Sequence, residues 1–235
     1  MKKLYFLVIL LFASVLITSC SKKDDNPAAP GETAPGIPSV SFKGPNTSST
    51  DQFAQQTKSI VTSFNAYPML FSGMFASVKP SGGGNNWNWV LSPGNGATET
   101  FTGTKNSDGS YSWKLVFNGT VDDVSYNNFK AMDGHTSADG KSGNWRIYED
   151  NTTTLVAEFS WTTSSSGVLS GNLIEYDGPD ISGQMTVVNN TDNSGELKIY
   201  GQNSEMQFNS TWKADGTGEW HSYDNGLETT NGNWN

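Results

Sequence analysis

Apolar and polar residues alternate with a period of two along most of the chain after Asn85. The clearest runs are Tyr111, Trp113, Leu115 and Phe117, then Leu155, Ala157, Phe159 and Trp161, and finally Met206 and Phe208 leading to Trp212. Such alternation predicts strands with one buried and one hydrated face, as in antiparallel sheets. No segment with a helical period lies between the runs that is long enough for a crossover, so we expect no parallel pairing.

Turn-forming dipeptides separate these runs. They are Pro93-Gly94, Asp108-Gly109, Asp133-Gly134, Asp139-Gly140, Asp177-Gly178, Asp215-Gly216 and Asn225-Gly226. Asp-Gly and Asn-Gly favour the tight turns of hairpins because their residues tolerate a positive φ. The sequence therefore predicts an all-β fold, an antiparallel meander of about 11–12 strands that forms either a barrel or a strongly curved sheet.

The segment after Thr50 has a helical pattern instead. Its apolar residues are spaced mostly by three or by one, and they are Phe53, Ile60, Val61, Phe64, Tyr67, Leu70, Phe71, Met74 and Phe75. This spacing predicts an amphipathic helix over about 51–66, with Thr50 as its cap and Asp51 as an acid that the helix dipole favours, and a second turn or helix after Pro68. The polar face of the first helix carries a single lysine, Lys58. We therefore expect the helix to pack on the sheet and not on a membrane surface.

The two patterns combine into one predicted core. The helix is expected to cover a continuous buried face of the sheet through Phe53, Ile60, Phe64 and Phe71. The aromatic residues expected on that face are Trp113, Trp145, Phe159, Trp161 and Trp220. Their sequence neighbours are mostly polar, and these neighbours stay hydrated only if the aromatic residues point inward.

A short motif recurs in the C-terminal half. Its copies are Gly143–Tyr148, Gly171–Tyr176, Gly195–Tyr200 and Gly218–Tyr223, and a truncated copy begins at Gly232. Each full copy has glycine, Asn or Glu, a large apolar residue, two variable positions and tyrosine. The starts of the full copies are 28, 24 and 23 residues apart, which is the length of one hairpin. The large apolar residue is expected to face the core, and the tyrosine the opposite side unless a bulge intervenes.

These repeats resemble MORN-type β-hairpin repeats over about residues 138–235. The second glycine of the MORN pattern is irregular here and the period varies. The resemblance therefore implies hairpin repeats and carries no functional assignment.

The first twenty residues have the pattern of a secretory signal. Two lysines (2–3) precede an apolar run of 14 residues (4–17), and a small residue, Ser19, stands before Cys20, the only cysteine. The run is shorter than the roughly 20 residues that span a bilayer. The tetrad Ile-Thr-Ser-Cys at 17–20 resembles the lipobox of bacterial lipoproteins. That resemblance implies cleavage before Cys20 and attachment of acyl chains such as palmitate to it; the alternative is a buried cysteine after an ordinary signal.

The next residues are typical of a linker. Five prolines and few apolar residues occur between residues 21 and 49, so this stretch cannot offset the entropy lost on folding. Its Lys-Lys-Asp-Asp run (22–25) resembles the signal that exports lipoproteins of the Bacteroidetes type to the outer face of the outer membrane. The alternatives are retention facing the periplasm and a merely solvated charge run. We expect a signal peptide (1–19), a lipidated cysteine with a flexible tether (20–49), and a single β-rich domain (50–235).

Charge and composition argue against several classes of function. The chain has a formal charge of −9, and without residues 1–19 it would carry 12 basic and 23 acidic residues, with Arg146 as its single arginine. Nucleic-acid binding and attachment to anionic lipid both need clustered basic residues, so we expect no nucleic-acid partner and membrane contact only through acyl chains. One cysteine leaves no disulfide framework and no thiolate-cluster metal site.

Motifs for metals and cofactors are sparse. His135 and His221 have no second imidazole or thiolate near them in the sequence, so we expect neither a metal nor a cofactor. The glycine-flanked run at 134–142 has five residues between its glycines, where a phosphate loop needs four. We expect it to be a hairpin turn.

Glu175 and Asp177 are the best catalytic candidates, because alternate residues of a strand share one face. Their spacing resembles the Glu-x-Asp-x-x-Glu strand of laminarinase-like glycoside hydrolases, which implies paired carboxylates for glycoside hydrolysis. Here the last position is Asp180, and Gly178 and Pro179 end the strand before it. The alternative is a solvated strand end.

Trp87, Trp89 and Trp234 lie among asparagines and are candidate ligand-binding residues. An indole beside amide groups suits a sugar ring, which needs stacking and hydrogen bonds together. The alternative is that Trp87 and Trp89, two positions apart, face the core.

Three classes of function remain open. The first, which charge and composition favour, is a non-enzymatic lipoprotein of the outer membrane or cell surface with a binding or structural role toward a glycan or protein. The second is a carrier that holds an apolar ligand or lipid between the helix and a curved sheet. The third is a glycoside hydrolase that uses Glu175 and Asp177, which would need the two carboxylates about 5 to 10 Å apart in a groove.

Overall fold

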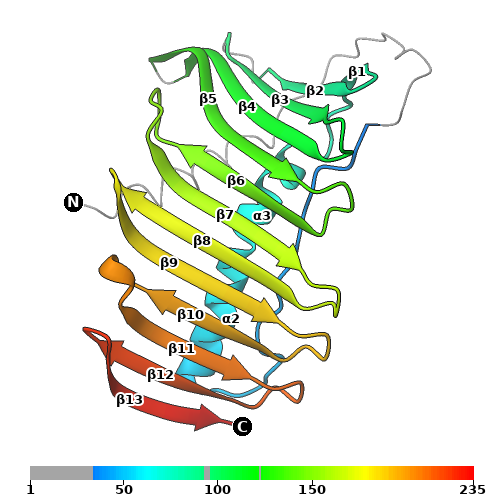
Figure 1. Cartoon of the computed structure of the whole chain (residues 1–235). Helices are drawn as coiled ribbons and strands as arrows, with labels where there is room; N and C mark the ends of the chain where they lie inside the picture. Colours follow the sequence, from blue (N-terminus) through cyan, green and yellow to red (C-terminus); the bar gives the residue numbers. More distant parts are fainter. Residues whose placement is uncertain (1–33, 93–95, 122) are drawn as a thin grey trace.

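The computed structural model describes residues 34–92, 96–121 and 123–235. The expected signal peptide, lipobox and export motif lie outside the described residues, as does the turn expected at Pro93-Gly94. In the described part, the chain forms one sheet with two helices and an extended N-terminal segment on one of its faces (Figure 1).

The sheet has 13 described strands, and each pairs antiparallel with its neighbours in chain order. The strands are β1 (Ser81–Gly83), β2 (Asn86–Leu91), β3 (Thr98–Lys105), β4 (Tyr111–Val121), β5 (Val124–Thr136), β6 (Ser142–Tyr148), β7 (Leu155–Thr163), β8 (Leu169–Asp177), β9 (Asp180–Asn189), β10 (Gly195–Tyr200), β11 (Met206–Trp212), β12 (Gly218–Asp224) and β13 (Leu227–Trp234). The antiparallel meander is confirmed. The barrel alternative is wrong, because β1 and β13 are the two edges of an open sheet.

Four hairpin turns at one end of the sheet are built alike. In each, an aspartate Oδ1 accepts a hydrogen bond from the backbone N–H two residues later. These aspartates are Asp108, Asp139, Asp192 and Asp215. The residue after each aspartate has a positive φ, and it is glycine in three turns and Asn193 in the fourth. The 134–142 run contains the second of these turns, so the expectation of a hairpin turn there is confirmed.

The turn expected at Asp133-Gly134 is wrong, because both residues lie inside β5. Gly134 pairs with Trp113 on one side and Trp145 on the other. A Cβ at this position would collide with the Trp145 ring. The glycine is therefore required by the neighbouring indole and not by a turn.

Two helices, α2 (Gln52–Phe64) and α3 (Ala66–Met74), cross the sheet on one face (Figure 1). Asp51 caps α2, and its Oδ1 accepts hydrogen bonds from the backbone of Phe53 at 2.8 Å and of Ala54 at 3.1 Å. The cap was expected one residue earlier, at Thr50, but the Asp51 carboxylate satisfies the free N–H groups of the first turn.

The helices break at Asn65 and not, as expected, at Pro68. Proline is tolerated in the first turn of a helix, where its missing N–H needs no intrahelical partner, so α3 starts before it. Asn65 instead holds another segment: its Nδ2 donates to Phe42 O at 2.8 Å, and its Oδ1 accepts from Phe42 N at 2.7 Å.

The face below the helices is the core. Its expected aromatic residues Trp113, Trp145, Phe159 and Trp161 are each at most 2% exposed. Trp220 is half-buried and stacks on Phe53, with ring centroids 3.6 Å apart. The Phe64 ring meets the Phe159 ring at 5.3 Å. The covered aromatic face is thus confirmed, while the side chain of Phe71 lies outside the described residues.

Residues 34–49 form an extended segment, the N-terminal strap, which runs on the same face as the helices (Figure 1). Phe42 is 2% exposed, and its ring meets Phe64 edge-on at 5.0 Å. Lys43 N donates to Asn189 Oδ1 at 2.7 Å, and Asn189 Nδ2 donates to Lys43 O at 2.8 Å. The expectation that the fold begins near residue 50 is therefore wrong. A buried aromatic ring and two side-chain amides bind this proline-rich stretch to the domain.

Candidate functional site

The three indoles interpreted as possible ligand-binding residues belong to the core. Trp87, Trp89 and Trp234 expose 3%, 4% and 3% of their surface. The Trp89 ring lies 6.1 Å from that of Trp113, and Trp234 Nε1 donates to Gly216 O at 2.8 Å. A sugar cannot stack on these rings unless the core opens. The hypothesis of a sugar site at these residues is therefore wrong, because the three indoles lie on the buried face of the sheet.

Glu175 lies on the helix-covered face of β8, next to the helices. The Tyr67 hydroxyl of α3 donates to Glu175 Oε1 at 3.1 Å. Burial raises the pKa of Tyr67 well above its usual range, and the negative charge of Glu175 and this hydrogen bond raise it further. Tyr67 therefore stays a protonated donor at physiological pH, and it fixes one oxygen of the carboxylate.

Asp177 does not share this environment. The register of β8 and β9 shifts between Glu175 and Tyr176, and Asp177 is exposed opposite Asp180 at the hairpin turn. The bulge interrupts the simple alternation on which a shared face for the two carboxylates depends.

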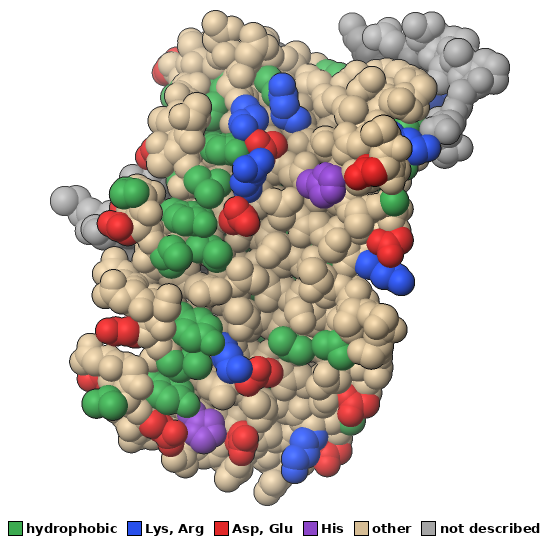
Figure 2. Space-filling model, viewed as in Figure 1, with side chains coloured by type: hydrophobic (Ala, Val, Ile, Leu, Met, Phe, Trp, Pro, Cys, Tyr) green, Lys and Arg blue, Asp and Glu red, His purple; other side chains and the backbone are tan. Residues whose placement is uncertain are grey.

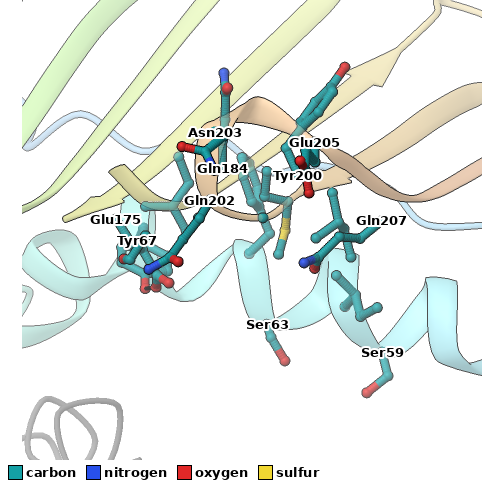
Figure 3. A pocket seen from close by; sticks show the side chains of 18 residues that line it. Ser59, Ser63, Tyr67, Glu175, Gln184, Tyr200, Gln202, Asn203, Glu205 and Gln207 are labelled. Carbon is teal, nitrogen blue, oxygen red and sulfur yellow. Dashed lines mark hydrogen bonds between the residues drawn. The ribbon is translucent and has the colours of Figure 1, made fainter. Parts of the chain in front are cut away.

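A cleft of about 830 Å³ opens beside α2, along the ends of β8 to β11 (Figure 3). Its apolar lining consists of Ile60, Phe64, Leu173, Met185 and Ile199. Glu175, Tyr67 and Gln202 point toward one another at one end of the cleft, while Ser59 and Ser63 point away from it (Figure 3). No local pattern predicts this cleft, because its walls come from segments that are far apart in the chain.

The cleft has an uncompensated negative charge. Glu175 and Glu205 line it, together with amides including Gln202 and Gln207. Among the described residues that line it there is no Lys, Arg or His. The wall is therefore suited to a hydrogen-bonding or cationic ligand and repels an anion.

A second surface lies on the opposite face of the sheet, where each full repeat ends in a tyrosine at a bulge. These residues, Tyr148, Tyr176, Tyr200 and Tyr223, are here called the outer tyrosine row, and each adjoins a register shift. All four are partly exposed. Figure 2 shows hydrophobic side chains gathered along the side of this face at which β6, β8, β10 and β12 end.

Polar partners place these tyrosines on the outer face. The Tyr148 hydroxyl donates to Asp133 Oδ2 at 2.9 Å, and the charge of Glu158 acts on Tyr176. Lys198, whose Nζ donates to Glu196 Oε2 at 2.8 Å, lies near both remaining tyrosines of the row. A bulge occurs at each repeat tyrosine, which was the condition named for a change of face, yet Tyr148 still reaches Asp133 on the outer face.

Beside the row, polar side chains form a line across the sheet. In register order from β2 to β13 they are Asn86, Thr104, Ser112, His135, Asn144, Ser160, Asn172, Thr186, Lys198, Asn209, His221 and Asn231. Most are small amides or hydroxyls, which both donate and accept hydrogen bonds. The outer face therefore offers aromatic rings with neutral polar groups next to them.

One charged network stands at the first tyrosine of the row. Asp133 accepts hydrogen bonds from Lys130, from Arg146 Nε at 2.7 Å and from Tyr148 at 2.9 Å. Partial burial favours the neutral acid, but the hydrogen bonds from Lys130 and Tyr148 and the charge of Arg146 outweigh it and lower the pKa of Asp133. Asp133 is therefore a stable anion that orients the ring of Tyr148.

The two histidines are apart from each other. His135 lies between Ser112 and Asn144 in the polar line, and His221 Nδ1 is 3.2 Å from Glu228 Oε2. In the part of the chain that the structure describes, no three His, Cys, Asp or Glu residues gather as a metal site would require. No helix among the described residues is long and apolar enough to cross a membrane.

Comparison with known protein families and with curated protein sequences finds no match to this chain. The site must therefore be interpreted from its own chemistry.

Proposed function

We propose that this protein is a lipid-anchored binding protein of the outer membrane, displayed at the cell surface and acting without catalysis. The lipobox-like tetrad ending in Cys20 and the Lys-Lys-Asp-Asp run after it support the anchor and its export. Thirteen residues lie between Cys20 and Ala34, so the two are at most about 50 Å apart when the chain between them is fully extended. Because the strap belongs to the domain, the anchor would hold the sheet nearer the membrane than a tether of 30 residues would.

The outer tyrosine row is the observation that supports a binding role. Tyr148 and Tyr176 occupy equivalent positions two strands apart, and so do Tyr200 and Tyr223. Strands lie about 4.8 Å apart, so each pair spans about 10 Å. The two pairs are offset from each other by two residues along the strand direction. Tyr200 pairs with Gln184, and Gln184 pairs with Ile174, which is two residues before Tyr176.

A neutral glycan chain is the ligand that fits this surface best. Partly exposed tyrosine rings stack on the C–H faces of sugars, and the neighbouring amides and hydroxyls bond to sugar hydroxyls. Two or more equivalent rings along one path favour a polymer over a single sugar, because each further ring adds a contact at high effective concentration. The proposal is therefore an extended polysaccharide that crosses the strands along the row.

Affinity electrophoresis in native gels tests this proposal. The acidic protein migrates toward the anode, and gels cast with β-1,3-glucan, β-1,4-xylan or α-mannan should retard it if the polysaccharide binds. Tyr176→Ala and Tyr223→Ala should weaken the retarding interaction about three- to tenfold, the effect of losing one aromatic contact. Tyr176→Phe keeps the ring and serves as the matched control.

Retardation by none of the polysaccharides, or equal retardation of the alanine variants, would overturn the glycan proposal and leave a protein partner as the better interpretation. The carrier function is not proposed, because Glu175, Glu205 and several amides line the cleft beside α2, and an apolar ligand would desolvate these groups without bonding to them. Hydrolysis is not proposed either, because Asp177 stands beyond the bulge that follows Glu175.

A further inference from the structure

The cleft beside α2 opens on the helix-covered face, and it reaches the outer tyrosine row at Tyr200, which is among its lining residues although its ring points away from α2 (Figure 3). We propose that it is a second binding site, and that it takes a small organic cation, an ammonium group on a short hydrocarbon body. The proposal does not rest on the glycan function, because it depends on Glu175, which is bonded to Tyr67 of α3 on the helix-covered face.

The orientation of Glu175 is the first support. Its Oε1 is held by the Tyr67 hydroxyl, and its Oε2 faces the backbone of Gly183 on β9. A Cβ built on Gly183 would lie 3.8 Å from that Oε2 and 3.7 Å from Tyr200 O. There is thus room for an extra carbon atom beside the free oxygen. A carboxylate with one oxygen fixed and the other open to a cleft is preorganised for a charged donor.

Charge is the second support. Glu175 and Glu205 line the cleft, and none of its described lining residues is basic. Opposite charge is worth more in a partly desolvated cleft than in open water, so these carboxylates favour a cation over a neutral molecule of equal shape. The net negative charge of the whole chain adds attraction at longer range.

The apolar lining is the third support, and it distinguishes an organic cation from a metal ion. Ile60, Leu173, Met185 and Ile199 offer hydrocarbon contacts, which a hydrated metal ion does not use. A volume of about 830 Å³ is within the range of pockets that hold small molecules. The ligand should therefore place its ammonium group at Glu175 and its hydrocarbon part on this lining.

Isothermal titration calorimetry of the mature chain, residues 20–235, tests the inference with two probes of equal length, n-hexylammonium and 1-hexanol. The ammonium probe should bind at least about tenfold more tightly at pH 7. Raising the salt from about 50 mM to about 500 mM should weaken its binding and leave hexanol unchanged. Glu175→Gln, which keeps the shape, should reduce the preference for the charged probe at least about tenfold.

Gly183→Leu fills the cleft from its wall without a change of charge, and it should abolish binding of both probes. Tyr223→Ala, on the outer face, should change neither affinity. Equal affinity for the two probes, no binding of the ammonium probe, or unchanged binding in Glu175→Gln would each overturn the inference. If Gly183→Leu does not fold, Glu175→Gln and the salt series still decide, since neither alters the packing of the sheet.

Discussion

The indole of Trp113 on β4 covers Gly103 on β3, its direct partner across the sheet. A Cβ on Gly103 would lie only 2.7 Å from Cζ3 of that ring. The arrangement recurs: Trp161 covers Gly143, Trp212 covers Gly195, and further indoles cover other glycines of the repeats. In three of the four full repeats, the glycine that opens the repeat thus lies under an indole of the next strand, whereas Gly171 lies under the rings of Phe42 and Phe64.

Replacement of Gly103 by alanine should therefore destabilise the fold. The new methyl group would force the Trp113 ring out of place, and such overpacking costs about 1 to 3 kcal/mol. The free energy of unfolding in urea measures this loss. Gly83→Ala on β1 is the control, because a Cβ at Gly83 meets nothing within 4 Å, and it should stay within about 0.5 kcal/mol of the native chain. Equal stability of the two variants would show that Gly103 is not required under the indole.

The sheet could be predicted because its signals are local. Alternation with period two and Asx-Gly turns act within one hairpin, and they specify antiparallel pairing of neighbours. The turn predicted at Asp133-Gly134 is wrong because the reason for this glycine is a contact between strands and not a local signal. A glycine that an indole covers cannot be told from a turn glycine in the sequence. Only the strand register, which pairs Gly134 with Trp145, distinguishes the two cases.

The cleft could not be predicted for a related reason. The hydrogen bond between Tyr67 and Glu175 joins residues 108 positions apart, and only the packing of α3 on β8 brings them together. The strap has only a weak signal in the sequence, because Val40 and Phe42 are apolar at alternate positions within the proline-rich stretch. The composition of residues 21–49 predicts a flexible tether. The buried ring of Phe42 and the hydrogen bonds between Lys43 and Asn189 nevertheless hold the strap on the domain.

Phe42→Ala in the strap should cost about 3 to 5 kcal/mol, as for other buried phenylalanines, because it leaves a cavity between Phe64 and Phe159. Ser41→Ala, next to it and exposed, is the control and should be nearly neutral. Denaturant unfolding reports both. A protein that begins at Ser49 should likewise lose more than about 1 kcal/mol, and unchanged midpoints for the truncated protein and Phe42→Ala would show that the strap is dispensable.

The Asp133 network should make stability depend on pH. Its folded pKa is lowered, so the ionised form stabilises the fold at neutral pH, and this contribution disappears as the pH falls through the acid range toward and below the lowered value. Asp133→Asn should lose about 1 to 2 kcal/mol at pH 7, because it removes charged partners from Lys130 and Arg146. The gap between variant and native chain should narrow below about pH 4 and close only below the lowered pKa of Asp133. A gap of constant size between pH 7 and pH 3 would show that the carboxylate charge is not the cause.

Surface display can be checked by adding proteinase K to intact cells. If the run at 22–25 directs export, the β-rich domain should be digested in cells that carry the native chain. Replacement of Asp24 and Asp25 by alanine should leave the protein membrane-bound but protected, because the anchor at Cys20 remains. Digestion that is equal for the two proteins would show that these acidic residues do not direct the protein outward, and protection of both would place the domain on the periplasmic side.

Cys20 should be the site of lipid attachment. It is the only cysteine of the chain, so a thioether-linked lipid has no other position available. Two or more acyl chains give stable membrane anchoring where a single chain gives only reversible binding, and a net negative chain cannot compensate by attraction to anionic lipid. Cys20→Ala should therefore lose metabolic labelling with a fatty-acid probe and should leave the membrane fraction. Cys20→Ser, which keeps a small polar side chain but no thiol, should behave in the same way. Labelling that persists in either variant would mean that the acyl chains are held elsewhere, and the proposed anchor would then be wrong.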